Sequence, residues 1–175
     1  MRGQPSGLLV HRSAIDRQAQ RFAMQMTRDQ IGQRVYPVHR LDKPTSGVLI
    51  FALSPEAARR IGPAFAGGEV DKTYLAVVRG YTDEQGIIDY PLKEKQDRMT
   101  DARARTDKPA QPAVTSYRRL AITELPVAVD RYPTSRYSLI EAQPQTGRRH
   151  QLRRHFKHIA HPIIGDGKYG KGRHN

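Results

Sequence analysis

The apolar residues of this chain occur in short runs, and this feature restricts its possible folds more than any other. Residues 47–53 form one continuous apolar run, and residues 70–80 alternate, so that odd and even positions face opposite sides. Two further strand-like stretches cover residues 112–122 and 134–142. Helices do not alternate regularly with these strands. The pattern therefore predicts an α+β fold with a mixed, mainly antiparallel sheet and flanking helices.

Three segments have helical patterns. The first spans residues 13–31, where Ser13 is a candidate N-cap and Gly32 a candidate C-terminal glycine. A second helix is predicted to begin after Ser54, with Pro55 at its first position, and to end at Pro63 and the glycine pair that follows. The third spans about residues 148–160 and has an apolar stripe. Residues 93–108 have almost no apolar content and are predicted to form a solvated loop.

The charge indicates what the chain binds. Its 30 Lys and Arg residues outnumber 17 Asp and Glu, which gives a net charge of +13. Such a field attracts polyanions. A membrane surface fits less well than nucleic acid, because no basic amphipathic helix has an aromatic face. Without a signal-peptide pattern, a membrane-length apolar run or any cysteine, the chain is expected to be cytoplasmic.

A candidate catalytic carboxylate lies in the segment of residues 39–47. Asp42 stands between Arg40 and Lys43, in a turn that Pro44 and Gly47 would form. Positive neighbours favour the ionised carboxylate that a nucleophile or base needs at neutral pH. The alternative is an ordinary turn aspartate that bonds the nearby backbone, and the residues alone favour that alternative.

A second candidate site is the basic segment of residues 146–155. On a helix, Arg149, Arg153 and Lys157 would share one face. They could follow a phosphate backbone, one arginine could pair with a catalytic carboxylate, or the face could simply be solvated. Histidines also recur every third residue, at His155, His158 and His161. A zinc site there ranks below RNA contact, because the chain has no cysteine and few carboxylates nearby.

Tyr74 is a third candidate, in the strand predicted over residues 70–80. Its ring could stack on an extruded base, and its hydroxyl could carry a proton. The simpler interpretation is a strand tyrosine whose ring packs in the core.

Taken together, these segments resemble the RluA-type family of RNA pseudouridine synthases. The residues from His39 to Asp42, followed by a Thr-Ser-Gly sequence, match its catalytic motif. Further matches are Pro5-Ser6-Gly7 with Val10-His11 (Gln4 replaces the usual lysine), Lys72 with Tyr74, residues 147–153, and His161-Pro162-Ile163 with Gly165-Asp166 and Tyr169-Gly170. The matches keep their order along the chain, and they reverse the preference for the ordinary turn interpretation of Asp42.

The resemblance implies roles for individual residues. Asp42 would start cleavage of the uridine C1′–N1 bond, by attack or by removing a sugar proton. Tyr74 would stack on the flipped uracil, and Arg153 would pair with Asp42 and keep it ionised. The residues expected to contact RNA are His39, Arg40, Arg148, Arg149, Arg154 and Lys157. The reaction would need neither a cofactor nor a metal.

The resemblance also implies how the chain is organised and what it modifies. Residues 1–175 would form a single pseudouridine synthase catalytic domain, a monomer, that lacks terminal elements at both ends. Residues 102–137 are most similar to a branch that modifies position 65 of certain tRNAs. The alternatives are a ribosomal RNA synthase of the same family, and an RNA-binding fragment without catalytic activity.

Overall fold

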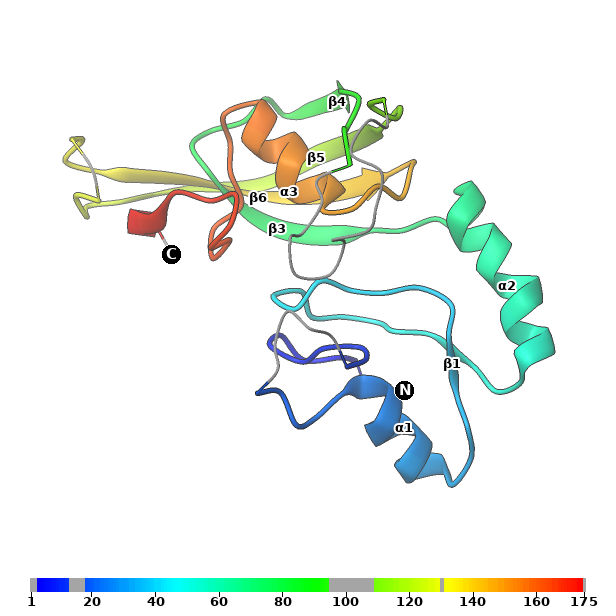
Figure 1. Cartoon of the computed structure of the whole chain (residues 1–175). Helices are drawn as coiled ribbons and strands as arrows, with labels where there is room; N and C mark the ends of the chain where they lie inside the picture. The colour runs from blue at the N-terminus through cyan, green and yellow to red at the C-terminus, as the bar shows by residue number, and fades with distance from the viewer. Residues whose placement is uncertain (1–2, 13–17, 95–108, 130, 175) are drawn as a thin grey trace. The chain divides into compact units, whose positions relative to one another are not determined.

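In a computed structural model, the chain forms two compact units (Figure 1). The structure describes residues 3–12, 18–94, 109–129 and 131–174. Unit 1 includes residues 1–70, and unit 2 includes residues 71–94 and 109–175. In the described part of the chain, no helix is long and apolar enough to cross a bilayer.

Unit 1 is built from short elements. Its helices are α1 (Ala23–Ile31) and α2 (Pro55–Gly67), and its two short antiparallel strands are β1 (Tyr36–Pro37) and β2 (Phe51–Ala52). Helix α1 ends at Gly32, whose φ of 70° is the left-handed conformation expected there. Helix α2 has the predicted start, because the Ser54 side chain accepts a hydrogen bond of 3.1 Å from the Ala57 amide.

Three predictions for unit 1 were wrong in extent. The first helix begins only at Ala23, because residues 18–22 are not helical, and its predicted start at residues 13–17 lies outside the described residues. The run 47–53 contributes only Phe51–Ala52 to a strand, and Val48 and Leu53 are exposed. The third is wrong only at Pro63, which lies inside α2, because the helix ends at Gly67 with Gly68 as its left-handed C-cap, and the predicted end at the glycine pair is confirmed.

Unit 2 contains a four-stranded antiparallel sheet in the order β3-β6-β5-β4 (Figure 1). The strands are β3 (Tyr74–Arg79), β4 (Gln85–Asp89), β5 (Val114–Leu125) and β6 (Ser135–Pro144). Helix α3 (Gln151–His158) packs on it, and a 3-10 turn spans Gly172–His174. The antiparallel α+β prediction is therefore confirmed, whereas β4 had not been predicted.

The core of unit 2 lies between one sheet face and α3. Phe156 is fully buried against Val78 and Ile140, and it meets Tyr117 edge to face, with 5.6 Å between the ring centroids. The predicted two faces of β3 are confirmed, because Val78 is fully buried and Leu75 is 67% exposed. The predicted apolar stripe of α3 is confirmed as well, since its residues pack on this core.

The cap of α2 gives a first prediction. Ser54→Ala should lower the stability of this helix by about 1 kcal/mol, because the amide at its first turn loses its acceptor. Hydrogen exchange of the α2 amides would measure the change. Ser54→Asp is the matched control, since it restores an acceptor, and equal exchange rates in both variants would contradict the capping role.

Candidate active site

Asp42 lies half-buried in a turn of unit 1 that main-chain bonds close. The Thr45 amide donates to the Asp42 carbonyl at 2.9 Å, and the Gly7 amide donates to the Lys43 carbonyl at 2.7 Å. The Ser6 hydroxyl adds a bond of 3.0 Å to the carbonyl of Pro44. The turn that carries the predicted catalytic carboxylate is thus tied to the N-terminal segment.

The same segment fixes the end of the Asp42 loop. Gln4 and Gly47 exchange two main-chain bonds of 2.6 and 2.9 Å, and the buried Gln4 side chain donates to the carbonyl of Leu8 at 2.7 Å. Gly47 has a φ of 139°, which side chains disfavour. Residue 4 therefore holds the end of this loop through its main chain, whereas its side chain bonds within the N-terminal segment.

His39 and Arg40 precede Asp42, and the structure gives them different surroundings. The His39 ring stacks on Phe65, with 4.5 Å between centroids, and its Nε2 accepts a bond of 3.0 Å from the Ile50 amide. Arg40 is exposed. His39 thus has a structural role in unit 1, and the RNA contacts predicted for both residues stay predictions.

In unit 2, Gln151 anchors the first turn of α3 to the sheet. Its Oε1 accepts from the Thr146 hydroxyl at 2.7 Å and from the Arg148 amide at 2.9 Å. Its Nε2 donates to the Val114 carbonyl at 2.9 Å and to the Thr115 hydroxyl at 3.1 Å. All four hydrogen-bonding positions of this buried amide are used. These bonds fix the first turn of α3 relative to β5.

His155 continues this network one helical turn later. Its Nε2 lies 3.1 Å from the Tyr90 carbonyl, which can only accept, so Nε2 carries the proton. Its Nδ1 then accepts from the Thr115 hydroxyl at 3.0 Å. Burial lowers the pKa of His155, although the bond to Tyr90 opposes this in part. The network therefore requires a neutral histidine.

Arg153 projects from the anchored helix toward Asp166. Its Nε and Nη2 donate to the two oxygens of Asp166 at 2.7 and 2.8 Å. The Asp166 side chain is only 3% exposed and that of Arg153 is 14% exposed. The guanidinium also lies 5.1 Å from the ring centroid of Tyr169, whose hydroxyl is 3.1 Å from Nδ1 of His150. A bidentate pair fixes the plane of the guanidinium.

Asp166 is held in its charged form. Burial by itself raises the pKa of its carboxyl, but hydrogen bonds from Arg153 and from the amides of Tyr169 and Lys168 outweigh burial. Together they lower the pKa from 3.8 to about 2. Asp166 is thus a charged partner of Arg153 that the sequence analysis had not assigned.

The segment after α3 ties this cluster to the strand that carries Tyr74. The Arg79 amide donates to the Pro162 carbonyl at 3.0 Å, and the Ile164 amide donates to the Val77 carbonyl at 2.9 Å. Asp166 follows two residues after Ile164. Tyr74, half-buried at the start of β3, and Arg153 therefore belong to one hydrogen-bonded framework in unit 2. Asp42 belongs to unit 1, so its pairing with Arg153 stays a prediction.

The remaining basic residues lie around α3. Arg148 is half-buried, and its Nε donates to the carbonyl of Pro112 at 3.0 Å. Arg149 and Arg154 are also half-buried, whereas Lys157 is exposed. These positions do not test their predicted contacts with RNA.

The three histidines weighed as a zinc site each have partners other than one another. His155 bonds Thr115 and Tyr90, His158 stacks on the Tyr90 ring at 3.6 Å, and His161 donates to the Arg79 carbonyl at 2.8 Å. Among the described residues, no group of three or more His, Asp or Glu is placed to hold a metal ion.

Sequence reasoning had noted Gln151, Asp166 and Tyr169 as motif residues but gave them no role as supports for Arg153. Helical spacing could not relate Asp166 to Arg153, because Asp166 lies beyond the end of α3. The available signal was Asp166 itself, which is the one carboxylate after residue 146 in a strongly basic stretch. A lone acid among arginines is a candidate ion-pair partner.

The sequence is similar to known proteins over nearly its whole length. The family described as RNA pseudouridylate synthase matches residues 4–158. The chain is 56% identical to tRNA pseudouridine synthase C of Vibrio cholerae, over 98% of this chain and 70% of that protein. It is 59% identical to the protein of the same name from Pectobacterium carotovorum, over 98% of this chain and 46% of that protein.

Two solved structures of proteins with similar names have a similar fold. The human RNA pseudouridylate synthase domain containing 4 superposes with a TM-score of 0.69 at 28% identity, over 97% of this chain and 64% of that chain. The human domain containing 1 reaches a TM-score of 0.73 at 23% identity, with the same coverage, and supports the fold alone.

The charged pair in unit 2 gives a prediction with a definite pH range. Asp166→Asn should lower the free energy of unfolding by about 2 kcal/mol at pH 7, because a carboxyl with a depressed pKa stabilises the fold above its unfolded value. The difference should shrink only as the pH falls from about 4 toward 2. Denaturant unfolding of both proteins over this range would measure it.

Asp29→Asn is the control for this pair. Asp29 bonds Arg28 on α1, but both side chains are more than half exposed, so the substitution should change stability by less than about 1 kcal/mol. If the difference in unfolding free energy between wild type and Asp166→Asn disappeared between pH 7 and 5, this would contradict the low pKa assigned to Asp166.

His155 gives a second pH-dependent prediction, in which the stability of the fold again decreases as the pH falls. Its pKa is lower in the folded protein, so the unfolded chain takes up a proton first as the pH falls below about 6.5. Wild-type stability should therefore decline from pH 7 to 5 more steeply than that of His155→Gln, which keeps a donor and an acceptor. Parallel curves for the two proteins would show that His155 does not contribute this dependence.

Proposed function

Because this chain belongs to the RNA pseudouridylate synthase family, we propose that it converts a uridine of tRNA, at position 65, to pseudouridine. The observation that supports this most is identity above 50% to bacterial tRNA pseudouridine synthase C over nearly the whole chain. The chain spans 70% of one such relative and 46% of another. The cytoplasm, where tRNA is matured, is the proposed location.

The reaction exchanges one glycosidic bond for another within the same nucleotide. The C1′–N1 bond of the uridine breaks, the uracil rotates, and a C1′–C5 bond forms. The proton on C5 is lost and N1 gains one, so that atoms and electrons balance without an oxidant or a cofactor. The target must leave the stack first, at a cost of a few kcal/mol, which phosphate contacts can offset.

Asp42 is proposed as the group that starts bond cleavage, by attack or by removal of a sugar proton. Its support is the motif and the clamped turn that presents it, with main-chain bonds of 2.6–2.9 Å to the N-terminal segment. A fixed backbone limits the positions that the carboxylate can sample, as positioning of a nucleophile or base requires.

Arg153 is proposed as the cation that keeps Asp42 ionised, and Tyr74 as the ring that stacks on the flipped uracil. Asp166 uses the Nε and Nη2 groups of Arg153, so the guanidinium has a set plane before substrate arrives. Tyr74 belongs to β3, which pairs with the segment that leads to Asp166. Both groups would therefore keep their spacing during the reaction.

The proposed RNA contacts are sequence-independent phosphate contacts around these residues. They come from unit 1 before Asp42 and from unit 2 on and next to α3. The residues are His39, Arg40, Arg148, Arg149, Arg154 and Lys157.

The proposal predicts that Asp42→Ala and Asp42→Asn lower pseudouridine formation at least about a hundredfold, because the initiating group is lost. Purified chain would be incubated with unmodified tRNA, and pseudouridine would be mapped by position. Asp29→Asn is the matched control, because it removes an exposed carboxylate and should leave the rate unchanged.

Three outcomes would contradict the proposal. The wild-type chain could form no product while binding tRNA in a salt-sensitive manner, which is the behaviour of a non-catalytic RNA-binding fragment. Product could appear in ribosomal RNA and not in tRNA when both are offered. Finally, the Asp42 variants could form as much product as wild type.

A further inference from the structure

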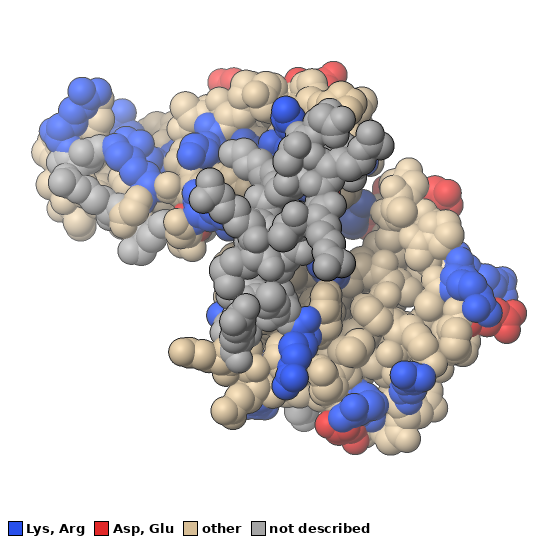
Figure 2. Space-filling model, in the orientation of Figure 1, with Lys and Arg blue, Asp and Glu red and all other residues tan. Residues whose placement is uncertain are grey.

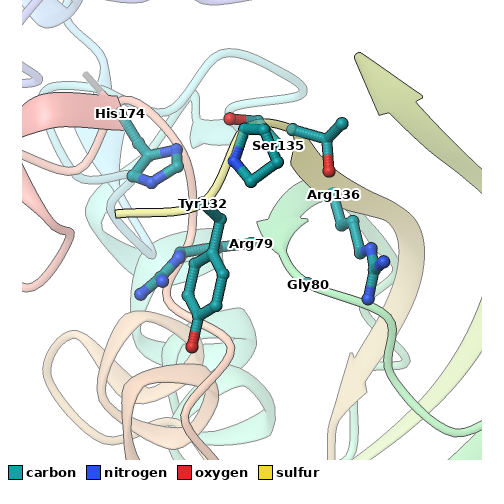
Figure 3. A pocket seen from close by; sticks show the side chains of 8 residues that line it. Arg79, Gly80, Tyr132, Ser135, Arg136 and His174 are labelled. Atoms are coloured by element: carbon teal, nitrogen blue, oxygen red, sulfur yellow. The ribbon is translucent and has the colours of Figure 1, made fainter. Parts of the chain in front are cut away.

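A pocket of about 460 Å³ lies in unit 2 where the end of β3 meets the start of β6 (Figure 3). It contains neither Tyr74 nor Arg153. Its size falls within the range of roughly 300–1,000 Å³ that is typical of small-ligand sites. Its lining residues are Arg79, Gly80, Tyr132, Pro133, Thr134, Ser135, Arg136 and His174. Two arginines, a histidine and an exposed tyrosine thus face one cavity.

The backbone on the β3 side of this pocket is firmly held. His161 donates from Nδ1 to the Arg79 carbonyl at 2.8 Å, and Pro162 accepts from the Arg79 amide at 3.0 Å. Gly80, with a φ of 81°, donates to the Arg136 carbonyl at 2.7 Å and accepts from the Ser138 hydroxyl at 2.9 Å. A side chain at Gly80 would lie 3.1 Å from the His161 ring. The main chain at Arg79 is therefore fixed, which limits the positions that its side chain can sample.

The charges around the pocket favour an anion. Arg136 pairs through Nε with Glu124 at 3.2 Å, yet its side chain stays 58% exposed. Glu124 also accepts from Thr134 at 2.5 Å and from Tyr81 at 3.0 Å, so three hydrogen-bond donors already engage this carboxylate. Among the described residues, no ion pair engages Arg79. Figure 2 shows basic side chains at the hairpin end of this unit.

Tyr132 gives the pocket an aromatic surface. Tyr132 is 51% exposed, and it is not among the described residues that form the hydrophobic core of this unit. The neighbouring Arg131 holds the ring, with its guanidinium 5.1 Å from the centroid and a bond of 2.9 Å from Nη2 to the hydroxyl. An exposed ring beside arginines is the usual surface for stacking an unpaired base whose phosphates are bound nearby.

From this juxtaposition we propose that the pocket binds one unpaired nucleotide of the RNA substrate, with its base on Tyr132 and its flanking phosphates at Arg79 and Arg136. The inference rests on the proposed function, because it takes RNA as the ligand. It adds a second contact point on the RNA, apart from the residues that would perform the isomerisation. Such a contact would favour RNA that carries an extruded nucleotide over continuous duplex.

The test is a binding measurement with a fluorescein-labelled oligouridine of about eight nucleotides, the size of a typical single-stranded site. Tyr132→Ala should weaken binding about fivefold or more, the loss expected for one stacked base. Arg79→Gln should weaken binding as well and lower the slope of log K against log salt by about 0.7, as expected for one lost phosphate contact.

Two matched variants separate this site from general effects. Tyr132→Phe keeps the stacking ring and should bind within about twofold of wild type. Arg28→Gln removes the same charge from the exposed surface of α1, so it measures how much RNA affinity is lost through the change in net charge alone. A blunt RNA duplex should show no sensitivity to Tyr132→Ala.

Each possible result decides the question. Loss in both pocket variants, with binding retained in Tyr132→Phe and Arg28→Gln, supports the site. Unchanged binding in either pocket variant, equal losses in Arg28→Gln and Arg79→Gln, or equal losses for duplex RNA would overturn it. Binding is measured without catalysis, so this outcome is independent of whether the wild-type chain forms pseudouridine.

Discussion

The bidentate pair between Arg153 and Asp166 is the interaction on which the orientation of the proposed catalytic arginine depends. It joins α3 to the segment that pairs with β3, and it lies almost entirely out of solvent. Burying two charges costs several kcal/mol each, so such a pair contributes little net stability unless its geometry is nearly ideal. Here two short bonds from Arg153 and two backbone amides satisfy the carboxylate, and the result is a guanidinium with one orientation.

The pair can have this role only because α3 is itself held in place. Gln151 and His155 attach the helix to β5 through Thr115, in a chain of donors and acceptors that runs in one direction. The last proton of this chain goes to the Tyr90 carbonyl, which can only accept. A protonated His155 would break this order, since Nδ1 could no longer accept from Thr115. Polar groups, rather than apolar packing alone, therefore set the position of Arg153.

Sequence reasoning succeeded where one local cause decides the structure. The Ser54 cap, the left-handed Gly32 and the two faces of β3 follow from backbone and side-chain properties within a few residues. It failed for residues 18–22 and 47–53. Their apolar residues match a helical or a strand period, but Phe22 and Gly47 bridge to the N-terminal residues Leu9 and Gln4 instead. Tertiary hydrogen bonds of this kind override a local period.

For the candidate site, the sequence by itself determined the family motif around Asp42, the basic character of the chain and the presence of Tyr74 and Arg153. Only the tertiary structure decided that Asp166 orients Arg153, that Thr115 links Gln151 to His155, and that Arg79 and Tyr132 share a pocket. The physical reason is that these partners lie 13 to about 50 residues apart in the chain. Neither periodicity nor spacing relates such residues, because their contacts exist only once the sheet has formed.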